Sequence, residues 1–130
     1  DLARVAESVF AVEWSTRAVA FGRRNVAAVG GAARVVWQAG TVAQAQRGLR
    51  EQKPQVVVVD PPRTGLTPRD LVSMSELSPE RVVYVSCDPM TLCRDLSRWA
   101  QLGWVALDAT PLDLMPQTFH VEVVAILARS

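Results

Sequence analysis

The chain has 130 residues, of which 49% are hydrophobic and 21% are charged, and its formal net charge is +1. This length suits one domain that buries roughly two-thirds of the surface exposed on unfolding. The composition excludes a membrane-spanning chain, because no apolar run approaches ~18 residues. A net charge of +1 is also too small to bind nucleic acid by electrostatic attraction alone.

Apolar runs that predict strands alternate along the chain with segments that predict helices. In chain order the predicted elements are strand Ser8–Glu13, helix Ser15–Val29, strand Ala33–Gln38, helix Val42–Gln52, strand Val56–Val59, helix Pro68–Leu77, strand Arg81–Ser86, helix Pro89–Ala100, strand Gly103–Ala109 and strand Phe119–Leu127. Ser15 is a candidate N-cap, Gly30-Gly31 a candidate stop and Pro89 a candidate first helical residue. The unbroken Val56–Val59 run predicts a strand buried on both faces. The alternation predicts an α/β fold with a parallel, doubly wound sheet.

Acidic and thiol side chains follow the ends of several predicted strands. Glu13 closes the first strand, Asp60 follows the third and Cys87 follows the fourth. In open parallel sheets, ligands bind at the carboxyl ends of the strands. Glu122 lies near the start of the last strand, so it reaches the same edge only if that strand runs antiparallel to its neighbours. With that assumption, the sequence predicts all four residues at one rim.

Each of these residues also has a purely structural interpretation. An acid after a first strand, as at Glu13, is often a helix cap. Asp60 could belong to a rigid turn with a surface ion pair to Arg63, although two prolines after a strand fix its carboxylate and favour function. Cys87 could be a buried core cysteine. At a strand end just before a helix opened by Pro89, it could instead react as a thiolate.

The other residues with reactive or aromatic side chains are interpreted as structural. Cys93 lies within a predicted helix and is expected in the core. The two cysteines form no disulfide framework or zinc pattern. His120 is the only histidine and has no second ligand at metal spacing, so we expect a structural role for it and no metal site. The four tryptophans are expected in the core, except Trp14, which follows Glu13 at the rim.

Three segments resemble motifs of the RNA (uracil-C5) methyltransferase family, the enzymes that make 5-methyluridine in tRNA and rRNA. Residues 60–66, DPPRTGL, resemble the DPPR-x-G-L motif of that family. Residues 85–96, VSCDPMTLCRDL, resemble its V-S-C-N-P-x-T-L-A-R-D-L segment, and residues 113–122, DLMPQTFHVE, resemble its D-[LM]-[FM]-P-x-T-x-H-V-E segment. Their order and spacing match, and the resemblance covers essentially the whole chain.

The resemblance implies a Rossmann-like class I fold, with a mostly parallel sheet and an antiparallel last strand, that uses S-adenosyl-L-methionine. It implies that Cys87 is the nucleophile that adds to uracil C6 and that Glu122 is the base that removes the C5 proton. It assigns Glu13 to the ribose hydroxyls of the cofactor and Asp60 to the cofactor site. The implied partner is a tRNA or rRNA whose target base is flipped out of its stack, and neither DNA nor a membrane is expected.

The chain departs from the family pattern at single positions. Asp88 stands where the family usually has asparagine, and a carboxylate beside Cys87 would oppose thiolate formation. Cys93 replaces a common alanine. Thr41 lies where many members carry an acid, so weaker contacts to the adenine of the cofactor are expected.

The resemblance also leads us to expect a piece of a longer protein, since the chain starts at Asp1 and enters a strand almost at once. The first strand and glycine-rich loop of the family fold, and its RNA-binding regions, are expected upstream. Residues 1–130 are then a single, partial catalytic domain. By itself this domain should bind S-adenosyl-L-methionine poorly, fail to methylate RNA and have an apolar surface that a second copy could cover. The N-terminal stretch has no basic leader and no cleavage site, so a cytoplasmic location is expected.

Two other functions remain open on sequence grounds. An acid-Pro-Pro strand end also occurs in methyltransferases that modify a ring or exocyclic nitrogen, which need no thiol. A degenerate module that keeps the fold but only binds RNA or a partner is the non-enzymatic alternative. Cys87 and Glu122 together argue against that module.

Overall fold

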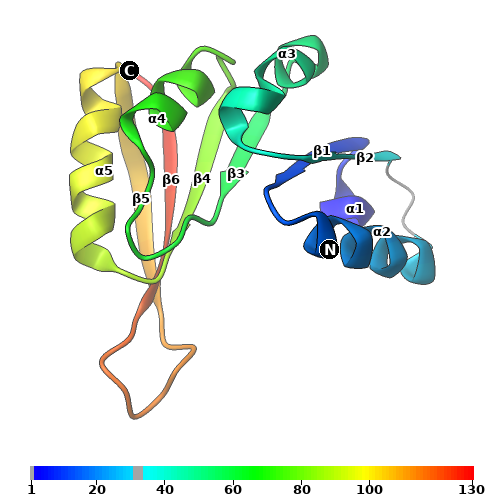
Figure 1. Ribbon diagram of the computed structural model, residues 1–130. Coiled ribbons are helices and arrows are strands. Elements are labelled where there is room, and N and C mark those ends of the chain that lie inside the picture. The colour runs from blue at the N-terminus through cyan, green and yellow to red at the C-terminus, as the bar shows by residue number, and fades with distance from the viewer. Residues whose placement is uncertain (1, 31–33) are drawn as a thin grey trace. The chain divides into compact units, whose positions relative to one another are not determined.

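The computed structural model describes residues 2–30 and 34–130, which form two compact units that meet in sequence at Gln52 and Lys53 (Figure 1). The elements in chain order are α1 (Leu2–Val5), β1 (Ser8–Glu13), α2 (Thr16–Val29), β2 (Arg34–Ala39), α3 (Val42–Gln52), β3 (Val56–Val59), α4 (Pro68–Ser75), β4 (Arg81–Ser86), α5 (Pro89–Gln101), β5 (Trp104–Leu112) and β6 (Glu122–Arg129). Gly31 and Ala33, which the sequence assigned to a helix stop and a strand start, lie outside the described residues. No helix among those described is long and apolar enough to cross a membrane.

The first unit is a pair of parallel strands, β1 and β2, between helices α2 and α3 (Figure 1). Its helix boundaries follow the expected caps. Ser15 Oγ accepts a hydrogen bond from the backbone N–H of Ala18, and Gly30 ends α2 in the left-handed conformation. Gly22 lets α2 approach the indole of Trp37, since a β-carbon at residue 22 would collide with that ring.

The second unit contains a four-stranded sheet in the order β3-β4-β6-β5. Strands β3 and β4 are parallel, and β6 runs antiparallel to both of its neighbours, β4 and β5. The predicted antiparallel last strand is therefore confirmed. Its antiparallel direction places the first residues of β6 beside the last residues of β4.

The core of this unit lies between the sheet and helices α4 and α5, which cover one face of it (Figure 1). Tyr84 on β4 and Leu127 on β6 point into this core and are fully buried. Trp99 of α5 packs edge-to-face on Trp104 of β5, with ring centroids 5.3 Å apart. The Trp104 indole N–H donates to Ser75 Oγ of α4 at 2.9 Å, so that its polar group is satisfied in the interior.

The prediction that Val56–Val59 is buried on both faces is wrong. Among the described strands β3 pairs only with β4, so it is an edge strand. The side chains of Val56 and Val58 are 51% and 45% exposed. They point to the face of the sheet opposite α4 and α5, because side chains alternate along a strand.

The prediction that Cys93 is a core residue is also wrong, since its side chain is exposed. Helix α5 buries Leu92, Asp95 and Trp99, which recur at helical spacing, and residue 93 lies off that stripe. Several boundaries differ from the sequence analysis as well. Strand β5 continues three residues beyond the predicted end, and β6 starts only at Glu122. The short helix α1 was not predicted.

Candidate active site

The register of the second sheet brings three of the predicted site residues to one edge. Val59 pairs with Tyr84, so β3 and β4 end side by side, and Asp60 and Cys87 follow these ends. Ser86, the last residue of β4, pairs with Val123. Glu122, the residue before Val123, therefore enters the sheet at the edge where the chain leaves β4 for Cys87. The predicted gathering of Asp60, Cys87 and Glu122 at one edge is thus present in this unit.

The segment after β4 is a tight turn that leads directly into α5. Cys87 is half-buried between the strand and the helix. Ser86 Oγ accepts from the Asp88 backbone N–H at 3.2 Å and donates to the Asp88 carbonyl at 3.0 Å. Asp88 is the N-cap of α5, because its Oδ1 accepts from the backbone N–H of Thr91 at 2.8 Å. Cys87 therefore lies at the N-terminus of a helix, where the helix dipole favours an anionic side chain.

The electrostatics of Asp88 oppose that effect. The hydrogen bond from the Thr91 backbone lowers the pKa of Asp88 below its ordinary value of 3.8, and the nearby Arg63 guanidinium contributes in the same direction. The carboxylate is therefore ionised at every pH at which a thiol titrates. The negative charge next to Cys87 is permanent near neutral pH and works against a thiolate there.

Replacing Asp88 with asparagine is therefore expected to speed alkylation of Cys87 by iodoacetamide at neutral pH. Asparagine still caps a helix but carries no charge, so the reacting anion is no longer repelled by its neighbour and the alkylation rate at pH 7 should rise by roughly threefold. The rate would be measured by mass spectrometry in a Cys93→Ala background, because Cys93 is exposed and would also react. An unchanged alkylation rate would show that the Asp88 charge does not affect the reaction of the thiol.

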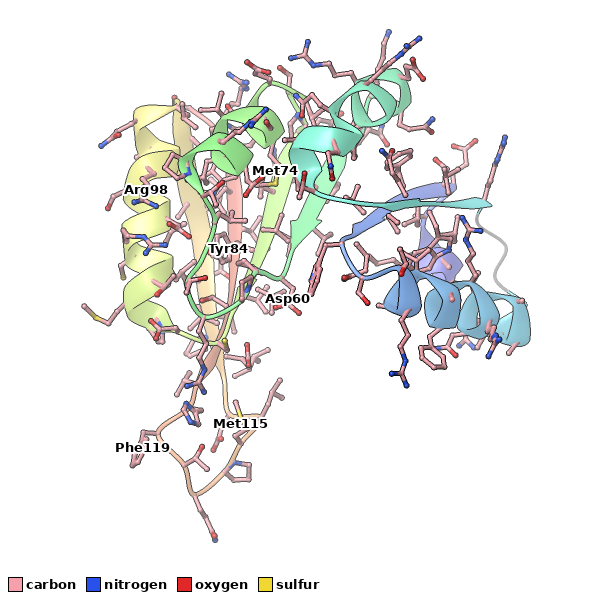
Figure 2. All side chains as sticks on the ribbon, viewed as in Figure 1. Asp60, Met74, Tyr84, Arg98, Met115 and Phe119 are labelled. Atoms are coloured by element: carbon pink, nitrogen blue, oxygen red, sulfur yellow. The ribbon has the colours of Figure 1, made fainter. Side chains whose placement is uncertain are left out.

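The Asp60–Arg63 turn is tied to the segment that precedes β6. The Arg63 Nη2 atom lies 3.1 Å from Nδ1 and 3.2 Å from Nε2 of His120, and it donates to the imidazole. The two residues are 57 positions apart, and sequence reasoning gave each a separate role. The two motifs that contain them signalled that both matter, but only the fold shows that they touch. Asp60 itself is exposed at the end of β3 (Figure 2).

The connection between β5 and β6 projects beyond the sheet and carries Met115 and Phe119 (Figure 2). Its turn is closed by Thr118, whose hydroxyl donates to the Met115 carbonyl at 2.7 Å and accepts from the His120 backbone N–H at 3.2 Å. These bonds bring the chain back into the sheet at Glu122. Phe119, at the start of this return, is 97% exposed.

Glu13 belongs to the first unit, where it ends β1. Its Oε1 atom accepts a hydrogen bond from the backbone N–H of Ser15 at 2.8 Å. The carboxylate thus supports the turn into α2, but the N-cap of that helix is Ser15 and not Glu13, so the interpretation of Glu13 as a helix cap is wrong. Trp14, which follows it, is 81% exposed, as expected for the one tryptophan assigned outside the core. Thr41, at the position where many members of the resembled family carry an acid, caps α3 by accepting from the Gln44 backbone N–H at 3.3 Å.

Two surface hollows lie in the first unit. The one between α2 and β2 has a volume of about 480 Å³ and is lined by Arg23, Val26, Ala27, Arg34, Val35, Val36 and Trp37. The other, of about 550 Å³, lies along α3. Neither is lined by a residue that the sequence analysis assigned to the site.

Solved structures share this arrangement of strands and helices. The chain superposes on the Pyrococcus abyssi tRNA (uracil-54, C5)-methyltransferase in complex with S-adenosyl-L-homocysteine with a TM-score of 0.74 and 33% identity, over 93% of this chain and 29% of that one. A putative tRNA methyltransferase of Streptococcus pneumoniae in complex with S-adenosyl-L-methionine gives a TM-score of 0.73 at 16% identity, over 95% of this chain and 56% of that one. That second likeness shows the fold alone.

The fold places the chain among the Rossmann-like, class I S-adenosyl-L-methionine-dependent methyltransferases. The sequence model of the tRNA (Uracil-5-)-methyltransferase family matches residues 1–130, and the chain belongs to that family. Uncharacterized RNA methyltransferases of Caldanaerobacter subterraneus and Gloeobacter violaceus are 37% and 44% identical to it over 99% of its length. The chain spans only 28% and 27% of those two relatives.

The carboxylates present are chemically suited to the cofactor of the family. Ribose hydroxyls and an ammonium group are hydrogen-bond donors, and a carboxylate at a strand end is an acceptor that can receive them. Glu13 is half-buried and held by the Ser15 backbone. Asp60 is exposed, and the two prolines that separate it from Arg63 fix the backbone of the turn.

Proposed function

We propose that the full-length protein methylates C5 of a uridine in tRNA or rRNA, with Cys87 as nucleophile and Glu122 as base. The observation that supports this most strongly is the pairing of Ser86 with Val123. It places the residue after Ser86 and the residue before Val123 at the same edge of neighbouring strands. A thiol and a carboxylate, separated by 35 positions in sequence, thereby become available to one substrate.

Cys87 would begin the reaction as a thiolate that adds to C6 of the flipped uracil. A carbon–sulfur bond forms, and the electron pair of the C5–C6 double bond moves toward the C4 carbonyl as an enolate. S-adenosyl-L-methionine, when bound, would supply an electrophilic methyl group to which the C5 carbon bonds as the methyl–sulfur bond breaks, with S-adenosyl-L-homocysteine as the leaving group. Glu122 then accepts the C5 proton, and the electron pair left behind re-forms the C5–C6 double bond as the Cys87 thiolate departs. A carboxylate suffices as base, because the C5 proton is acidified in the adduct.

The remaining assigned residues would bind rather than react. Glu13 would accept hydrogen bonds from the ribose hydroxyls of the cofactor, and Asp60 would contribute a carboxylate to the cofactor site. We also propose that residues 1–130 act as one partial catalytic domain. The net charge of +1 gives the chain little electrostatic hold on RNA, so that much of this hold would come from other parts of the full-length protein.

The proposal is tested by incubating the full-length protein with S-adenosyl-L-methionine and RNA that contains 5-fluorouridine. Fluorine at C5 cannot leave as a cation, so the reaction is expected to stop as a covalent protein–RNA adduct that survives a denaturing gel. Peptide mapping should then find the RNA on Cys87. With cofactor binding intact and several RNAs tried, the absence of an adduct would favour nitrogen methylation or a binding-only module. An adduct on Cys93 would contradict the assignment of the nucleophile.

A further inference from the structure

Asp95 is a fully buried carboxylate that the reaction proposed above does not use. It lies on α5, two turns after Cys87, and its side chain is 0% exposed. Its Oδ2 atom accepts from the Tyr84 hydroxyl at 2.8 Å and from the Leu66 backbone N–H at 2.8 Å. Tyr84 lies on β4, and Leu66 belongs to the loop after Arg63. One side chain therefore joins the strand, the helix and the loop that carry the candidate site.

The other carboxylate oxygen of Asp95 binds two arginines. Oδ1 accepts from Nε and Nη2 of Arg94 at 3.0 Å and 2.9 Å and from Nη1 of Arg98 at 3.2 Å (Arg98 and Tyr84 are labelled in Figure 2). Arg94 Nη2 also donates to the Thr64 carbonyl at 2.7 Å. The loop is thus held by the Leu66 N–H on Asp95 and by the Thr64 carbonyl on Arg94, and Arg98 Nη1 adds a longer hydrogen bond to the Leu66 carbonyl at 3.5 Å.

The loop is shaped to reach this carboxylate. Gly65 has a φ of +75°, and a β-carbon at this position would collide with the side chains of Asp95, Arg94 and Thr91. Its backbone N–H donates to the Pro62 carbonyl at 2.8 Å, which closes the turn directly after the two prolines. Glycine is required here both for the left-handed backbone and for the close approach to α5.

Because Asp95 is fully buried, loss of any of its hydrogen-bond partners would leave part of a charged carboxylate unsatisfied in the interior, which destabilises the fold. Burial, reinforced by the hydrogen bond to Asp95, raises the pKa of Tyr84, so that the hydroxyl remains a donor at any physiological pH. A buried charge contributes little net stability compared with an apolar side chain of the same volume. An apolar residue could fill the space but could not bind the loop N–H and orient Arg94. The carboxylate therefore serves to fix the positions of the loop and of Arg94 rather than to add net stability.

We propose that Asp95, together with Arg94, is a positioning residue that fixes the loop after Arg63 against α5, and thereby holds the preceding Asp60–Arg63 turn near the segment that carries Cys87. This inference rests on the proposed function, because the loop matters only if Asp60 and Cys87 serve one reaction. The register aligns β3 with β4 but leaves the chain after Val59 without ladder partners. The bonds of Asp95 to Leu66 and of Arg94 to Thr64 supply that missing constraint.

The test compares Asp95→Asn and Arg94→Gln with Arg69→Gln in the full-length protein. Arg69 is an exposed arginine of α4 and serves as the matched control. Asparagine keeps the volume of Asp95 but replaces one acceptor oxygen with a donor. Well below the unfolding temperature, kcat for methylation should fall by roughly 10- to 100-fold in Asp95→Asn and roughly tenfold in Arg94→Gln. The KM for RNA should change little, and Arg69→Gln should match the wild type.

Two further readouts separate positioning from stability. Alkylation of Cys87 by iodoacetamide should be unchanged in both variants, because the thiol itself is not altered. Hydrogen exchange at the Leu66 amide should become faster, because its acceptor is weakened. Arg94 is 43% exposed, so Arg94→Gln decides the question if Asp95→Asn does not fold.

The outcomes of this test are distinct. Folded variants with a wild-type kcat, or with a kcat that falls only as the unfolded fraction rises, would overturn the positioning role. A wild-type protein that forms no adduct with 5-fluorouridine RNA would instead refute the proposed function, and with it the reaction that the loop is inferred to serve.

Discussion

Replacing Cys87 with alanine is expected to abolish methylation by the full-length protein and to prevent the adduct with 5-fluorouridine RNA. Without the thiolate, uracil C5 stays a poor nucleophile, and nothing else among the described side chains at this edge can add to C6. The rate should fall by at least about 10⁴-fold, which corresponds to roughly 5 kcal/mol of activation free energy. The measurement is transfer of a labelled methyl group from S-adenosyl-L-methionine to RNA.

The matched control is Cys93→Ala. Cys93 lies six residues further on and is exposed on α5, where its backbone carbonyl accepts from the Ser97 hydroxyl. Replacing it removes a thiol of the same chemistry without touching the sheet edge, so activity should remain at the wild-type level. Equal loss in both variants would indicate damage to α5 rather than removal of a nucleophile. Full activity in Cys87→Ala would favour a nitrogen methyltransferase, which needs no thiol.

Replacing Glu122 with glutamine is expected to trap the enzyme on ordinary RNA after methyl transfer. The amide has nearly the shape of the carboxylate but cannot accept the C5 proton, so Cys87 cannot be released. Turnover should fall by roughly 10²- to 10⁴-fold, the usual contribution of a general base. A denaturing gel should show a protein–RNA adduct on uridine without fluorine, and mass spectrometry should find it already methylated.

The control for this variant is Asp108→Asn, another acid-to-amide change in the same pair of strands. Asp108 is exposed on β5, and its carboxylate accepts only a surface hydrogen bond from the Thr110 hydroxyl at 2.8 Å among the contacts described. Normal turnover in Asp108→Asn would assign the effect to Glu122 itself. An unmethylated adduct in Glu122→Gln would mean that Glu122 acts before methyl transfer and is not the base that removes the C5 proton.

Many elements of this protein could be predicted because their signals are local. Ser15 and Gly30 mark the ends of α2 by hydrogen bonding and by backbone conformation that involve only neighbouring residues. Pro89 opens α5 at its first turn, since proline lacks the N–H that this position does not need. The apolar runs Val56–Val59 and Arg81–Ser86 match β3 and β4 residue for residue. Each of these helix and strand boundaries is determined by interactions among a few neighbouring residues.

The burial of those elements was predicted less well. A run of valines shows that a strand forms, but not whether another layer covers each of its faces. Val56 and Val58 are exposed because β3 pairs with a single described strand and both helices lie on its other face. Cys93 is exposed for a comparable reason. The face of α5 that packs on the sheet contains Leu92, Asp95 and Trp99, and which face this is depends on how the helix docks on the strands rather than on the helix sequence alone.

For the candidate site as well, some features could be predicted from the sequence and others depend on the tertiary structure. The sequence by itself determined the residue types and their order, because the motifs around Asp60, Cys87 and Glu122 are contiguous. The resemblance already predicted that the last strand runs antiparallel, but only the tertiary structure decided that β6 lies between β4 and β5 and that Ser86 pairs with Val123, which brings Glu122 beside the chain that leaves Ser86. It also decided that Arg63 touches His120 and that Asp95 holds the loop after Arg63. These contacts join residues 29 to 57 positions apart, and their geometry depends on strand order and register, which are set by the packing of the whole unit rather than by any segment of it.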